Sequence, residues 1–159
     1  MKRKELAIVD ELIKDHSELL KSIEEIIKLT KTIQVNIGKA KISSDFFNVL
    51  KDAIYLSFKI SSLMAKLNEH MKLEEKLIRL SLQDLWLERE LNTLIDGIKR
   101  FSEIEREISK TLESYHKGAI TLDIVVETFI KFVNELQEIV YKHVTISDKV
   151  LHVVREYLT

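Results

Sequence analysis

One histidine and one glutamate stand at a spacing that could build a metal site. His70 and Glu74 are four residues apart in the stretch LNEHMKLEEKL, residues 67–77. Residues at this spacing share one face of a helix, and the stretch has the periodicity of an amphipathic helix. Both interrupt an apolar row that includes Leu63 and Leu77, so we expect both to face the core. If the pair is exposed, a solvated ion pair is the ordinary explanation. If it is buried, the glutamate charge must be compensated, and a bound metal ion is the more specific hypothesis.

Two further histidines occupy inward positions of the same kind. His16 replaces an apolar residue in the row of the expected first helix, and His143 does so in the expected fourth helix. Counted from the expected helix ends, the three histidines fall at one level to within about a helical turn. A lone inward histidine is more often a hydrogen-bonded core residue. Three of them with a carboxylate, on three helices, favour a metal site near one end of a bundle.

The other two histidines are expected to lie outside this site. His116 precedes Lys117 and Gly118, where the third helix is expected to end, so we expect it to be exposed. The HKG sequence resembles a phosphotransfer motif, but such histidines stand in the middle of a helix. His152 follows an expected break in the last helix and is interpreted as an ordinary residue, which would approach the site only if the chain folded back at that break.

The composition excludes several kinds of protein. The chain has no cysteine, which excludes disulfides, thiolate metal ligands and a cysteine nucleophile. Its 25 Lys and Arg nearly balance its 26 Asp and Glu, so charge gives no reason to expect nucleic acid or a membrane surface as a partner. No apolar run approaches the roughly 20 residues of a membrane span, and the N-terminus lacks the apolar core of a signal peptide. We therefore expect a soluble, cytoplasmic protein.

The absence of proline and the presence of only three glycines predict a few long helices. Apolar periodicity predicts helices from about Lys2 to Ile37, from Asp45 to Leu82, from a cap near Gln83 or Asp84 to Gly118, and from Thr121 onward with a break after His143. Short links between four helices favour an all-α, antiparallel up-down-up-down four-helix bundle, and nothing divides residues 1–159 into two domains. The predicted core rows also include Phe47, Ile54, Phe58, Trp86, Phe101, Tyr115 and Ile124.

Three segments resemble the hemerythrin-like, or HHE cation-binding, domain family in their order and spacing. They are KDHSELLKSIEEI around His16, NEHMKLEEKLI with His70 and Glu74, and YKHVTISDKVL, in which Asp148 follows His143 by five positions. The resemblance covers nearly the whole chain. It implies a hemerythrin-like bundle that holds non-haem iron, with His16, His70, Glu74, His143 and Asp148 as the metal ligands.

The sequence departs from this family on the third helix. The family carries a His-x-x-x-His pair there, and the matching positions by spacing from Glu74 are Arg89 and Thr93, of which Arg89 repels cations. Glu90 is the nearest substitute ligand. The remaining residues suit iron, manganese or zinc, so the site could hold one ion, two ions or none.

Two functions therefore remain open at this point. The first is a hemerythrin-like metal-binding protein, with iron bound and a role in binding or sensing dioxygen, nitric oxide or iron. The alternative is a bundle that has lost its metal and serves as a protein-interaction module. A ferritin-like oxidase is less favoured, because no Glu-x-x-His pair lies on an inward face. No phosphate loop or Gly-x-Ser-x-Gly motif is present, so a binding protein is favoured over an enzyme, and a homodimer is compatible with the sequence.

Overall fold

The chain forms four long α-helices. The computed structural model describes residues 2–43 and 46–159, with the backbone alone for residues 42–43 and 81–85. The helices are α1 (Lys2–Ser43), α2 (Phe47–Leu85), α3 (Glu88–His116) and α4 (Leu122–Leu158), and the described residues include no strand. The predicted all-α class and the number of helices are confirmed. None of the described helices is long and apolar enough to cross a membrane.

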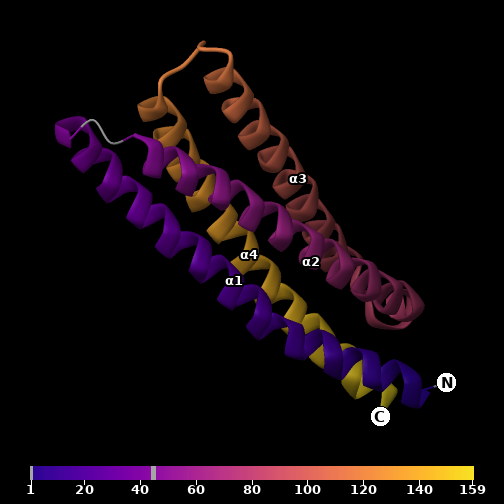
Figure 1. Cartoon of the computed structure of the whole chain (residues 1–159). Helices are drawn as coiled ribbons and strands as arrows, with labels where there is room; N and C mark the ends of the chain where they lie inside the picture. The colour runs from indigo at the N-terminus through magenta and orange to yellow at the C-terminus, as the bar shows by residue number, and fades with distance from the viewer. Residues whose placement is uncertain (1, 44–45) are drawn as a thin grey trace.

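The four helices pack side by side as a bundle (Figure 1). α1 and α3 each pack against both α2 and α4, and α2 also contacts α4. The N- and C-termini lie close together at one end, and the link between α3 and α4 lies at the opposite end (Figure 1). Side chains from facing helices can therefore meet along the middle of the bundle.

The apolar core is divided into two clusters along the bundle. The larger one contains Leu19, Leu67 and Val140, and the smaller one, nearer the chain ends, contains Leu12 and Val150. On α1, α2 and α4 the boundary between the clusters falls beside the three inward histidines of the sequence prediction. A polar layer thus interrupts an otherwise apolar interior at one level.

α1 and α2 end later than their sequence signals predict, and α3 therefore begins later than expected. α1 continues past Gly38 to Ser43, because buried Ile37 and Ala40 extend the apolar row on either side of the glycine. α2 includes Gln83 and Asp84, which were expected to cap α3. The expected start of the second helix at Asp45 lies outside the described residues.

The link between α2 and α3 is made by Trp86 and Leu87. Trp86 has a φ of 55°, in the left-handed region, and Leu87 is the N-cap residue of α3. α4 passes His143 without the predicted break. Gly118, with a φ of 77°, follows the end of α3, as predicted.

Several large apolar residues that were placed in core rows are exposed. Phe47 is 74% exposed, Phe58 69% and Trp86 86%, and Ile54 and Ile124 are also on the surface. The buried row of α2 instead follows small and medium side chains, including Val49, Ala53 and Leu56. The predicted α2 row was wrong because a second row with the same spacing, rotated around the helix, is the buried one, and Trp86 lies outside the helices, in the link between α2 and α3.

Replacing Gly38 with alanine should stabilise the protein. The residue lies inside α1, and an added Cβ would meet nothing within 4 Å. Alanine restricts the unfolded chain and favours the helix, so we expect a gain of about 0.5–1 kcal/mol in the free energy of unfolding. Urea unfolding of the variant and of the unchanged protein measures this difference in the free energy of unfolding. Gly118→Ala is the matched control and should destabilise, because its φ of 77° strains any side chain; a loss of stability in Gly38→Ala would contradict the prediction.

Candidate metal centre

Three buried residues from α2 and α4 bring metal-binding atoms together. They are His70 and Glu74 on α2 and His143 on α4, and one donor atom from each lies within 4.8 Å of the others. His70 is 2% exposed, Glu74 0% and His143 3%. The prediction that these side chains face the interior is therefore confirmed.

The spacing of the donor atoms suits a single ion. His70 Nε2 lies 3.1 Å from Glu74 Oε2, and His143 Nε2 lies 3.3 Å from the same oxygen. Donors about 2.1 Å from one ion stand about 3.0 Å apart at right angles and about 3.4 Å apart in a tetrahedron. The two measured distances fall between these values, so one ion could contact all three side chains with small adjustments.

The Glu74 carboxylate has no hydrogen-bond partner among the described residues. Both of its oxygens are buried, and the two imidazoles reach it at ion-pair distance without the alignment of a hydrogen bond. Burial acts to raise the pKa of Glu74. His143 and His70 together outweigh burial and lower the pKa to about 2. A negative charge is therefore held inside the bundle, where a cation is needed beside it.

An aspartate from α1 orients one of the imidazoles. His70 Nδ1 lies 3.5 Å from Asp15 Oδ2, at the limit of a hydrogen bond. A proton on Nδ1 that points to this carboxylate leaves Nε2 free to face the interior. Carboxylates commonly orient metal-binding histidines in this way and raise their affinity for the ion.

Ser147 is a buried site residue that sequence reasoning missed. It is 0% exposed, and its Oγ lies 2.8 Å from His16 Nε2 and 3.4 Å from His70 Nε2. It stands four residues after His143 and so shares its helix face. That spacing was the available signal, but the sequence prediction followed the His-to-Asp spacing to Asp148 instead.

His16 lies beside the three-residue group. Its ring centroid is 5.1 Å from that of His70, and its Nε2 contacts Ser147. Its Nδ1 lies 3.4 Å from Asp148 Oδ1, although the Asp148 side chain is 48% exposed. Burial and, secondarily, the charge of His70 lower the pKa of His16. His16 and Asp148 thus border the centre, and the structure does not place them in the group that surrounds one ion.

Ser147, His16 and Asp148 stand in the order of a nucleophile, a base and an orienting acid. Catalysis by this chain would require a substrate to reach the Ser147 hydroxyl. Since Ser147 has no exposed surface and lies inside α4, a substrate carbonyl could not approach it. The arrangement is better explained as a hydrogen-bonded support for the neighbouring metal-binding atoms.

The third helix brings no imidazole to the centre. Arg89 is exposed, and the Thr93 hydroxyl donates a hydrogen bond to the Arg89 carbonyl oxygen at 3.0 Å. Glu90 is half-buried, with one carboxylate oxygen buried and unpartnered, but it lies outside the three-residue group. His116 and His152 are exposed, as expected, and His152 Nε2 lies 3.8 Å from Asp148 Oδ2.

Comparisons with protein-family models, with characterised proteins and with solved structures found no match to this chain.

Replacing His16 with glutamine should flatten the pH dependence of folding stability in metal-free protein. Because the pKa of His16 is lowered on folding, the unfolded chain binds its proton more readily. The stability that depends on neutral His16 is present above the ordinary pKa of 6.5 and is lost as the pH falls below it. Urea unfolding in chelator between about pH 7 and pH 5 measures the slope.

His116→Gln is the matched control for this experiment, because His116 is exposed at the end of α3. The control should keep the slope of the unchanged protein. An unchanged slope in His16→Gln as well would contradict the prediction.

Proposed function

We propose that this protein binds one metal ion through His70, Glu74 and His143. The observation that supports the proposal is the Glu74 carboxylate, which is 0% exposed, anionic and without a hydrogen-bond partner among the described residues. A bound cation would compensate its charge and satisfy one of the two unpartnered ring nitrogens of His143 at the same time. His16 and Ser147 would support the ligands, and Asp15 would orient His70.

Iron(II) is the metal that we propose first. Two imidazoles and one carboxylate form the ligand set of many non-haem iron(II) sites, in which the remaining positions stay open for other molecules. Manganese and zinc also accept these donors. An open position on iron(II) would be suited to dioxygen or nitric oxide, in a binding or sensing role.

We further propose that the chain is a hemerythrin-like, antiparallel up-down-up-down bundle whose metal centre has fewer ligands than the family's. The positions of the chain ends and the packing of α1 and α3 against both other helices support this topology. The positions that match the family's third-helix histidines hold Arg89 and Thr93, so we propose one ion. A second ion would need Glu90 or Asp148, which lie outside the three-residue group.

The protein loaded anaerobically with iron(II) should hold about one equivalent of metal. Glu74→Gln and His143→Gln should each weaken binding by at least about 100-fold, because each removes a donor atom rather than an outer hydrogen bond. Metal analysis after desalting and competition with a chelator measure both effects. Less than about a tenth of an equivalent in the unchanged protein would reject the proposal.

Glu75→Gln is the matched control for Glu74→Gln. Glu75 is the next residue of α2, and it pairs with Arg79 on the surface at 2.7 Å. The control should bind metal like the unchanged protein. Equal losses in both variants would show that the effect is not specific to the buried carboxylate.

The second function, a protein-interaction module without metal, is favoured by an exposed apolar face of α2. Phe47, Ile54 and Phe58 share this face and are 74%, 39% and 69% exposed. Monomeric proteins seldom expose several large apolar side chains together unless a partner covers them. This function would leave Glu74 without a cation.

Glu74→Leu distinguishes the two functions. In chelator, leucine should stabilise the protein by about 1–4 kcal/mol, because it removes a buried charge. With iron(II) at about 100 times its Kd, the unchanged protein should gain about 2.7 kcal/mol and the variant should not. Thermal unfolding with and without metal measures both. If Glu74→Leu is more stable than the unchanged protein by the same amount with and without iron(II), the result would favour the interaction module.

A further inference from the structure

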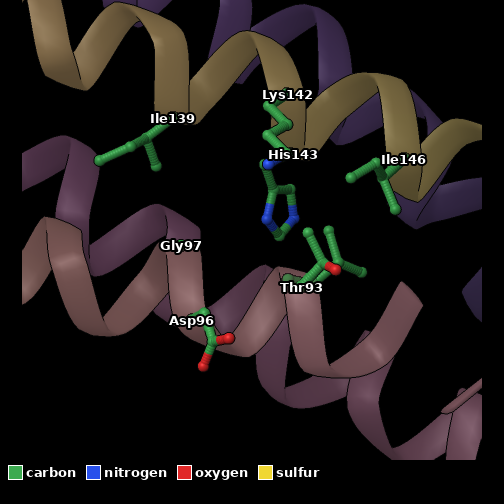
Figure 2. A pocket seen from close by; sticks show the side chains of 8 residues that line it. Thr93, Asp96, Gly97, Ile139, Lys142, His143 and Ile146 are labelled. Atoms are coloured by element: carbon green, nitrogen blue, oxygen red, sulfur yellow. The ribbon is translucent and has the colours of Figure 1, made fainter. Parts of the chain in front are cut away.

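A cavity between α3 and α4 is lined by one residue of the candidate metal centre, His143. Its volume is about 400 Å³, and its lining includes Thr93 and Gly97 on α3 and Ile139, His143 and Ile146 on α4. Figure 2 shows the imidazole of His143 extending from α4 toward α3, between Ile139 and Ile146. The cavity therefore connects the solvent with a residue of the three-residue group.

His143 has unused binding capacity on this side of the bundle. The residue is 3% exposed, and neither of its ring nitrogens has a hydrogen-bond partner among the described residues. Buried polar atoms in proteins are nearly always paired, so this imidazole is suited to bind a ligand that enters the cavity. The metal ion would take one nitrogen, and a molecule in the cavity could approach the ion beside it.

The charge near the cavity favours an anion. The exposed side chain of Lys142 lines it, and an adjoining pocket adds Arg89 and Lys149. Within the part of the chain that the structure describes, no ion pair is shown for these three cations. In the cavity itself Lys142 is balanced by Asp96, and the adjoining pocket adds two cations and one carboxylate, Glu90, so the two pockets together carry one excess positive charge.

The charge balance at the ion points the same way. A divalent cation with one carboxylate and two neutral imidazoles keeps one uncompensated positive charge. Three protein donors also leave at least one coordination position open. In a poorly hydrated interior, a ligand with one negative charge would complete both the charge and the coordination.

We propose that a small anion with one negative charge, for which formate serves as the probe, binds the metal ion through this cavity, with Lys142 favouring anions over neutral molecules. The cavity is wide enough for this, since a water molecule takes about 30 Å³ of liquid volume. Gly97 contributes to this space, because it places no side chain there. This inference rests on the proposed metal-binding function and adds the chemical class of the second ligand.

The experiment uses the full chain loaded with cobalt(II), whose visible absorption responds to a change of ligand. Metal analysis is done first, and formate is then added up to about 0.1 M. We expect a saturable change in the spectrum with formate and none with formamide, the uncharged molecule of similar size. Lys142→Gln should weaken formate binding by about three- to tenfold. Lys131 is an exposed lysine nearer the start of α4, and Lys131→Gln should leave formate binding unchanged.

Each outcome of this experiment decides a different statement. Bound cobalt without a response to formate overturns the anion inference and leaves the metal-binding function standing. Equal responses to formate and formamide, or equal formate affinity in the two lysine variants, overturn the selection of anions by Lys142. Failure to bind cobalt or iron overturns both the inference and the proposed function.

Discussion

The structure depends most on one buried charge, the carboxylate of Glu74. Removing a carboxylate from water costs several kcal/mol even after the protein relaxes. The rest of the apolar core cannot offset that cost locally, so the side chains around Glu74 must provide opposite charge. His70 and His143 converge on a single oxygen atom of this carboxylate. Their alignment satisfies distance but not hydrogen bonding, which is the arrangement expected of donors that face a common ion.

The polar layer around Glu74 is built unequally by the four helices. α2 and α4 provide the atoms that could bind an ion, and α1 provides His16 and Asp15, which hold the imidazoles and Ser147 in place. α3 provides mostly space, through Gly97 and the apolar wall of the cavity. His143 lines the cavity between α3 and α4, and His70 lines a second pocket between α1 and α2, so another molecule could approach the centre from either side.

Sequence alone predicted the four helices and the inward positions of His16, His70, Glu74 and His143, because both follow from local periodicity. The His70 and Glu74 spacing identified one helix face without knowledge of any neighbour. Ser147 was not predicted because its role depends on a contact with His16, which is distant in the sequence. Trp86 was misplaced because it lies outside the helices, in the link between α2 and α3, where no helix face buries it.

Other features depend on how the helices pack. No local sequence pattern predicts how α1 crosses α2 or at which level α3 meets α4. The contact of Asp15 with His70 and the cavity beside His143 follow from those crossings. At Gly38 a local signal for the end of a helix was present, but α1 continues past it because the residues around it are buried.

The position of Glu74 and His143 on helices that are distant in the chain has a mechanical consequence. A large part of the sequence, including all of α3, lies between these two residues. An ion held by both would act as a reversible cross-link that closes a long loop. Such closure restricts the unfolded chain in the way that a disulfide does, and longer loops are restricted more. In a chain without cysteine, occupancy of the centre would then set how tightly α2 and α4 are held together.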